Sequence, residues 1–316
     1  MRRLPLIALL LSTFASAGVQ AGVLDLTTQM GNANIYTLHN FNGSNSDVEG
    51  AIVSGGSVTA SSYAINHKDV DAYGGYAVAA RNNLTVSNGS IENGKAYAGG
   101  TTSLTNVTAP PTSATSPVNF DQLADYYNAL ATNLSHVGAT GTVASKYTGV
   151  LVTGNGNGKV DVFNVASSMF ANSSSWELAG LTAGQTLIFN VSGTSGTFNN
   201  GGVSFNPLSG YNVLFNFYEA TTLDVRGVIG SVLATKATVG PNYGVINGNV
   251  VVDAWNSSVQ VNANHYFQPV EVTGFDDPGA STTPAGGADV PEPAGVALFL
   301  GALGMAGLAR RKRAPK

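Results

Sequence analysis

Residues 50–59 read Gly-Ala-Ile-Val-Ser-Gly-Gly-Ser-Val-Thr, and this stretch decides the fold. A glycine precedes a short apolar strand, a small polar break follows (here Ser-Gly-Gly), and a second short strand comes after it. The same pattern occurs in four more segments: 75–86, 94–104, 230–239 and 248–259. Within each of the two blocks the starts are 18 to 25 residues apart. Such a repeat is typical of one coil of a β-solenoid, whose short strands stack in parallel around Gly and Asn corners.

Hairpins of a β-sandwich also recur at short spacing, so a sandwich is the alternative fold. We favour the solenoid because the Gly-Gly and Asn-Asn pairs lie inside each unit, where a coil turns its corners. Each block offers only two or three coils, and about three are needed for an independent core. The blocks 50–104 and 230–259 should therefore stack on each other despite the long gap between them.

One amphipathic helix is predicted between the two blocks. Prolines end the first block, and Asn119 can cap a helix that runs to about Ser135, with Gln122 as its capping-box partner. Its apolar residues are three or four positions apart and form one stripe: Phe120, Leu123, Tyr127, Leu130 and Leu134. The fold class is therefore mainly β, a solenoid with one long helix packed along its flank, and residues 147–220 continue it with alternating strands.

The composition suits a secreted β-rich protein. Hydrophobic residues make up 43% of the chain, charged residues 10%, and there is no cysteine. Most of the basic residues lie in the two ends, so the middle is more acidic than the net charge of −4 suggests. This distribution argues against a nucleic-acid partner, which requires clustered Lys and Arg.

The N-terminus has the features of a secretory signal peptide. Two arginines precede an apolar core, and Ala15 and Ala17 form an A-x-A cleavage site, with Ala21 as the end of a second possible site. Residues 1–21 are therefore expected to be the signal peptide, and the Sec machinery to be the export partner.

The C-terminus combines three features in order. Pro291, Glu292 and Pro293 form a stiff, extended triplet. An apolar helix is expected over 294–309, with an apolar run of roughly 15 residues that is short of the usual 20-residue span. Four basic residues follow and should hold that end in the cytoplasm: Arg310, Arg311, Lys312 and Arg313.

This tail, residues 290–316, resembles the PEP-CTERM sorting signal of Gram-negative bacteria. The resemblance implies transient insertion into the inner membrane and processing by an exosortase, after which the protein remains at the cell surface or in the extracellular matrix. An ordinary C-terminal membrane anchor is the alternative.

A second resemblance covers about residues 35–270. Residues 41–50, 190–193, 212–221 and 230–234 are similar, in the same order, to blocks of the choice-of-anchor A family of bacterial surface domains. The chain departs from the family at Phe215, Tyr218 and Thr235, changes that leave the expected fold intact. The resemblance implies an adhesive or matrix domain, expected over 22–275 with a flexible linker over 276–289. Its solenoid-plus-helix layout is similar to that of bacterial ice-binding proteins.

The sequence offers little that indicates catalysis. The four histidines show no zinc-binding spacing, and no serine-nucleophile motif occurs. The acid pairs Asp47 with Glu49 and Asp69 with Asp71 could serve glycoside hydrolysis or calcium binding, but capping or solvated turns explain them better. No cofactor or metal is expected.

The candidate binding surface consists of short hydroxyl side chains on the predicted coils. These residues are Ser57, Thr59, Thr101, Thr102, Thr235 and Thr238. Stacked coils would align them into a flat array that matches the hydroxyls of sugars or a water lattice. The alternative is that Ser and Thr simply suit exposed strand positions.

These observations predict a non-enzymatic, exported surface or matrix adhesin associated with exopolysaccharide or a biofilm. An ice-binding protein on the same scaffold is the alternative, although strict Thr-x-Thr ladders are missing. A polysaccharide-active enzyme that uses Asp47 or Asp69 is a minor alternative.

Overall fold

The computed structural model describes residues 21–171, 173–198 and 207–280. One compact unit extends to Gly279. The cleavage residues Ala15 and Ala17, the apolar run 294–309 and the sorting residues 291–293 and 310–313 lie outside the described residues. In the described part of the chain, no helix is both long and apolar enough to cross a membrane.

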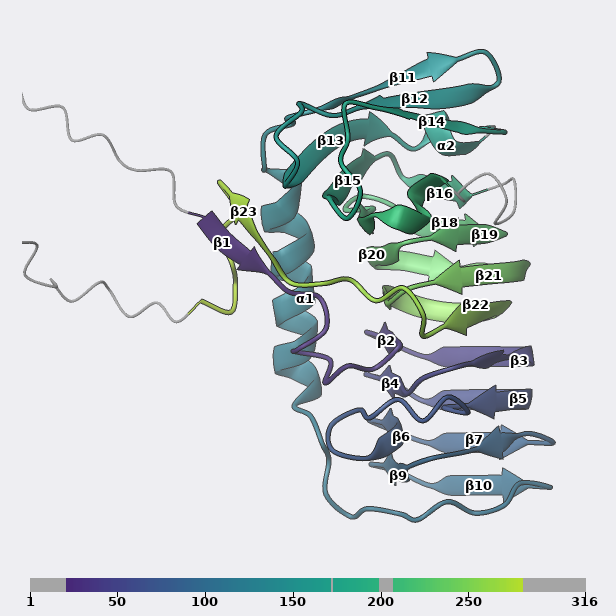
Figure 1. The fold of residues 1–316 in the computed structure, drawn as a ribbon. Helices are drawn as coiled ribbons and strands as arrows, with labels where there is room; N and C mark the ends of the chain where they lie inside the picture. Colours follow the sequence, from purple (N-terminus) through teal and green to yellow (C-terminus); the bar gives the residue numbers. More distant parts are fainter. Residues whose placement is uncertain (1–20, 172, 199–206, 281–316) are drawn as a thin grey trace, which may run out of the picture. The chain divides into compact units, whose positions relative to one another are not determined.

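The fold is a parallel β-solenoid with three ladders, here called faces A, B and C (Figure 1). Face A contains β13 (Val160–Ala166), β15 (Thr186–Ser192), β17 (Asn212–Asn216), the first parts of β20 (Ser231–Val239) and β22 (Val250–Asn262), β2 (Ile35–Thr37), β4 (Ile52–Ser54), β6 (Tyr76–Ala80) and β9 (Lys95–Ala98). All of these neighbours pair in parallel. The expected solenoid is confirmed, and the sandwich alternative is wrong.

The same coils continue into the other two faces. Face B contains β16 (Ser195–Phe198), β18 (Thr222–Val225), the later parts of β20 and β22, the first parts of β3 (Phe41–Val48) and β5 (Val58–Ile65), β7 (Leu84–Ser87) and β10 (Thr102–Thr105). Face C contains β19 (Gly227–Ile229), β21 (Tyr243–Asn247), the ends of β22, β3 and β5, and β8 (Ser90–Ile91).

The chain enters this stack in its middle and returns there. Coils β2 to β10 lead away from the middle, and α1 (Phe120–Ser135) then runs back along the stack (Figure 1). The coils from β13 to β22 complete the stack, so that β22 pairs with β2 and β3. We call this junction the seam. It confirms that the two sequence blocks stack on each other, with Val250 beside Ile35 and Asn256 beside Asn42.

Three smaller elements complete the compact unit. The strands β11 (Thr142–Lys146), β12 (Gly149–Thr153) and β14 (Trp176–Ala179) form a separate sheet. The short helix α2 spans Ser168–Ala171. Finally, β1 (Ala21–Leu24) pairs with β23 (Val270–Thr273) in antiparallel fashion. Because Ala21 already belongs to β1, signal cleavage after Ala17 would leave that strand whole.

Helix α1 covers face A as its apolar stripe predicts. Asn119 caps it by accepting hydrogen bonds from the backbone N–H groups of Asp121 and Gln122. All five stripe residues are buried against an outward apolar row of face A that includes Tyr36, Val53, Ile188, Leu214, Leu233 and Val251. The side-chain amides of Asn190 and Asn216 also donate to the helix carbonyls of Leu134 and Ala131, at 2.8 and 2.9 Å. These two bonds attach the C-terminal part of the helix to face A.

Candidate functional site

An ordered row of short polar side chains covers much of face B. Each of five neighbouring coils presents two of them, at positions i and i+2 of its strand, and we call the set the polar array. Its members are Asn256 and Ser258, Asn42 and Ser44, Thr59 and Ser61, Thr85 and Ser87, and Ser103 and Thr105. All of them are exposed or half-buried.

Strand geometry sets the spacing of this array. Alternate residues of a strand point to the same side, so the residues between the array positions, such as Ala60 and Val86, face the core and are buried. Neighbouring coils lie about 4.8 Å apart, and positions i and i+2 about 6.6 Å. Two hydrogen bonds of 3.2 Å link the array across coils, one between Ser44 and Ser258 and one from the Ser87 hydroxyl to Ser61.

In four of the coils the backbone turns a corner directly after the second array residue, and these corners stack on one another. The residue after the second array position has a left-handed backbone: Asn45, Ser62, Asn88 and Asn106 have φ between 51° and 53°. Asparagine adopts this conformation more readily than most residues, which explains why it occurs at three of these corners. The identical corners keep successive pairs in register, and the array is therefore regular.

The six hydroxyl residues predicted from the sequence are dispersed in the structure. Thr59 belongs to the array and Thr238 is half-buried on another coil of face B. Ser57 and Thr101 sit at the corner between faces A and B, where their N–H groups bond to the side chains of Asn40 and Asn83.

Thr102 and Thr235 are not placed on the array. Thr102 pairs with Leu84 on the terminal coil, one position before the array residue Ser103, and its side chain is exposed. Thr235 is only 4% exposed, because β20 turns a corner there with a shift in register, so it offers no binding surface.

A signal for the array was nevertheless present in the sequence. The four-residue segments 42–45, 59–62, 85–88 and 103–106 read Asn-Gly-Ser-Asn, Thr-Ala-Ser-Ser, Thr-Val-Ser-Asn and Ser-Leu-Thr-Asn. Each has a small polar residue, an inward residue, a hydroxyl and then a corner residue. A search for Thr-x-Thr alone misses them because the first and third positions vary among Asn, Ser and Thr.

Face B is hollowed beside the array, where β16, β18 and the turn after β20 meet. This hollow, here called the upper hollow, has a volume of about 460 Å³. Its polar lining residues are Ser195, Thr197, Thr222, Asp224, Arg226, Thr238, Asn242 and Asn256. Asn256 belongs to both the hollow and the array, so the two regions are continuous.

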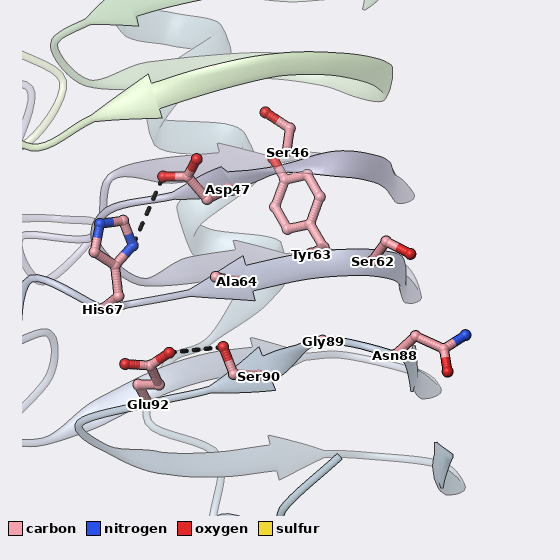
Figure 2. A pocket seen from close by; sticks show the side chains of 10 residues that line it. All are labelled: Ser46, Asp47, Ser62, Tyr63, Ala64, His67, Asn88, Gly89, Ser90 and Glu92. Carbon is pink, nitrogen blue, oxygen red and sulfur yellow. Dashed lines mark hydrogen bonds and ion pairs between the residues drawn. The ribbon is translucent and has the colours of Figure 1, made fainter. Parts of the chain in front are cut away.

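A second hollow, of about 670 Å³, lies on face C (Figure 2). Small residues, Ala64 and Gly89, leave space between Asp47 and His67 on one side and Glu92 on the other (Figure 2). The Asp47 carboxylate lies 3.6 Å from Nδ1 of His67 and accepts a 3.1 Å hydrogen bond from Gln260.

Two carboxylates of face C form hydrogen bonds across the seam. Asp47 belongs to the first coil and accepts its hydrogen bond from Gln260 on the last coil. Glu49, also on the first coil, accepts a hydrogen bond from the backbone N–H of Ala263, which follows the last coil. Burial raises the pKa of Asp47, and the neighbouring His67 partly opposes that rise. Both acids thus contact residues more than two hundred positions away.

The other candidate acids are not brought to this site. Asp69 and Asp71 are exposed, and Asp69 lies on a turn with φ of 55°. Across the described ranges, no three His, Asp or Glu side chains are grouped so that they could hold a metal ion.

Comparison with known families identifies the domain. Residues 27–263 match the family model described as "Putative Ice-binding-like adhesive domain", and the chain belongs to this family. Residues 289–313 match the PEP-CTERM protein-sorting motif. Both expected resemblances, to an adhesive surface domain and to the sorting signal, are thereby confirmed. Searches of curated proteins and of solved structures gave no significant match.

The raised pKa of Asp47 leads to a prediction about stability. A carboxyl whose folded pKa lies above its unfolded value supports the fold below that range and loses this contribution as the pH rises through the folded pKa. We therefore expect Asp47→Asn to leave the Tm at pH 7 unchanged or to raise it, and to lose any such advantage at pH 3. Thermal unfolding followed by circular dichroism measures both values.

The control is Asp69→Asn, an exposed turn position, which should leave the Tm unchanged at both pH values. A clearly lower Tm of D47N at pH 7 would mean that the contacts with His67 and Gln260 outweigh the cost of burial.

Proposed function

We propose that this member of the ice-binding-like adhesive family is a non-enzymatic surface adhesin that binds exopolysaccharide through the polar array of face B. The observation that carries the proposal is the regular, uncharged array on five successive coils. The family match and the sorting motif support an exported protein of adhesive type. Association with a biofilm matrix follows from such a ligand.

The array suits an extended sugar polymer. Each hydroxyl or amide can exchange a hydrogen bond with a sugar hydroxyl, and a single neutral bond contributes only about 1 kcal/mol. The coil spacing of about 4.8 Å is close to the length of one sugar residue in an extended chain. Successive residues of one polymer can therefore meet successive coils, and many weak contacts add up to useful affinity.

Ice binding is the second candidate function. The same regular spacing of short hydroxyls can order water, and the family description itself names ice-binding-like domains. Two features favour the sugar ligand. The array mixes Asn, Ser and Thr, and it continues into the polar upper hollow, which a flat crystal plane would not fill.

An enzymatic function receives less support from the geometry. The array contains no carboxylate, imidazole or lysine that could act as an acid, base or nucleophile. Asp47 contacts His67 and Gln260 at the seam, and Asp69 lies on an exposed turn.

The export route follows from the two ends of the chain. We propose that the Sec machinery exports the chain, that the apolar run 294–309 holds it briefly in the inner membrane, and that an exosortase cleaves near Pro291–Pro293. The basic residues 310–313 would stay in the cytoplasm until cleavage. The adhesive domain then remains at the cell surface or in the matrix.

The polar array can be tested by adding bulk to it. Thr59→Tyr combined with Thr85→Tyr places two large rings on the middle of the array, and we expect at least a tenfold loss of affinity for exopolysaccharide purified from the producing cells. Both threonines are exposed, so the Tm should hardly change. Pull-down of the polysaccharide with the full chain measures the effect.

The matched control is Thr142→Tyr, an exposed strand position on β11 outside face B. Equal polysaccharide binding by T59Y/T85Y and by wild type would refute the array as the binding surface. Inhibition of ice recrystallisation by wild type, lost in T59Y/T85Y, would favour the ice-binding function instead.

The sorting proposal has its own test. Replacing Pro291, Glu292 and Pro293 by alanines removes the rigid, extended segment that a protease can engage. We expect full-length protein to accumulate in the inner-membrane fraction on immunoblots. Normal-sized protein at the cell surface would contradict exosortase processing.

A further inference from the structure

The upper hollow contains two opposite charges that do not pair with each other. Asp224 and Arg226 both line it, two residues apart at the end of β18. The Asp224 carboxylate accepts a hydrogen bond from the side-chain amide of Asn242. Within the described ranges, the Arg226 guanidinium forms no ion pair or side-chain hydrogen bond, and its side chain is exposed. Both groups therefore remain available to a ligand.

The neighbouring sequence offers Arg226 no other carboxylate. Segment 199–206, which follows β16, reads Asn-Asn-Gly-Gly-Val-Ser-Phe-Asn and contains no Asp or Glu. The arginine is also distinctive because the array beside it carries no charge. A charged ligand on this part of face B would therefore find a charged partner in the upper hollow and not on the array.

The remaining walls of the hollow are suited to a sugar. Hydroxyls of Ser195, Thr197, Thr222 and Thr238 and the amide of Asn256 face the same space. Gly196 and Gly240 add no side chains to the lining. A volume of about 460 Å³ accommodates one or two sugar rings.

We propose that the upper hollow binds an acidic sugar, a uronate residue of the polysaccharide whose neighbouring sugars lie along the polar array. The Arg226 guanidinium would bind the uronate carboxylate, since its planar fork matches a carboxylate with two parallel hydrogen bonds. The free oxygen of Asp224 would accept a bond from a ring hydroxyl. This inference deepens the proposed function and rests on it.

The net acidity of the protein does not prevent this contact. Charges separated by more than about 8 Å are largely screened at physiological ionic strength. The local balance at the hollow therefore matters more than the total charge: the charges of Asp224 and Arg226 cancel, and the guanidinium has no ionic partner among the described residues.

The test compares two polymers that differ only in charge. Polygalacturonate carries a carboxylate on each sugar, and its fully methyl-esterified form has the same backbone without the charges. Full-length chain, purified in mild detergent, is passed over each immobilised polymer at 150 mM salt. We expect wild type to bind the acidic form about tenfold more tightly, the equivalent of one charge-assisted hydrogen-bonded contact.

The variants separate charge from geometry. Arg226→Gln should lose the preference for the acidic polymer while keeping the affinity for the ester. Arg226→Lys should keep only part of the preference, because lysine cannot form the paired bonds. Lys236→Gln is the control, since this exposed lysine does not line the hollow, and it should behave as wild type.

The outcomes distinguish the inference from the proposed function. Equal binding of both polymers by wild type, or a preference that survives in R226Q, overturns the uronate site. If T59Y/T85Y then still weakens binding of the ester, the array function stands without it. Failure of wild type to bind either polymer also overturns the uronate site, whereas the array function is decided by the pull-down of the cells' own exopolysaccharide.

Discussion

The parallel ladder at the seam is the interaction on which the rest of the structure depends. There β22, near the end of the domain, pairs with β2 and β3 near its start. The ring of Trp255 stacks on that of Phe41 at 5.8 Å, and the buried Asn34 amide donates to the carbonyl of Gly248 at 2.9 Å. Closing so long a loop costs entropy that grows only slowly with its length, so burial of two coil edges can offset it.

The seam also determines which surface can bind a ligand. Helix α1 needs an apolar face that spans both blocks, and face A provides it only when the blocks are stacked. With face A covered, faces B and C remain exposed. The polar array crosses the seam between Asn256 and Asn42, and the upper hollow lies on the coils from β16 to β22, on one side of the seam. A polymer that contacts both regions therefore requires the closed stack.

The sequence was sufficient for the parts of the fold that depend on local patterns. The stripe from Phe120 to Leu134 predicted the helix and its buried side, and the Gly-Gly and Asn-Asn pairs marked the corners. The need for a shared core predicted the stacking of the blocks. The array was harder to predict, because side-chain direction depends on the exact register and on the left-handed corners at Asn45, Ser62, Asn88 and Asn106.

The dependence of side-chain direction on register also explains why some of the predicted binding residues do not lie on the array. Thr235 looks like an exposed strand residue in the sequence, yet β20 shifts register between Ala234 and Thr238 and buries it. The upper hollow was missed altogether, because Ser195, Asp224 and Asn242 come from three different coils. Only the assembled stack shows that these side chains meet.

An engineered disulfide across the seam tests the closed stack most directly, since the chain has no cysteine of its own. Asn42 and Asn256 are paired neighbours with exposed side chains, at a coil spacing of about 4.8 Å that a disulfide can bridge. Mass spectrometry of Asn42→Cys/Asn256→Cys after mild oxidation should show one intramolecular bond. The control pair Ser103→Cys/Asn256→Cys, several coils apart, should stay reduced. Failure of the first pair to cross-link, or equal cross-linking of both, would contradict the closed solenoid.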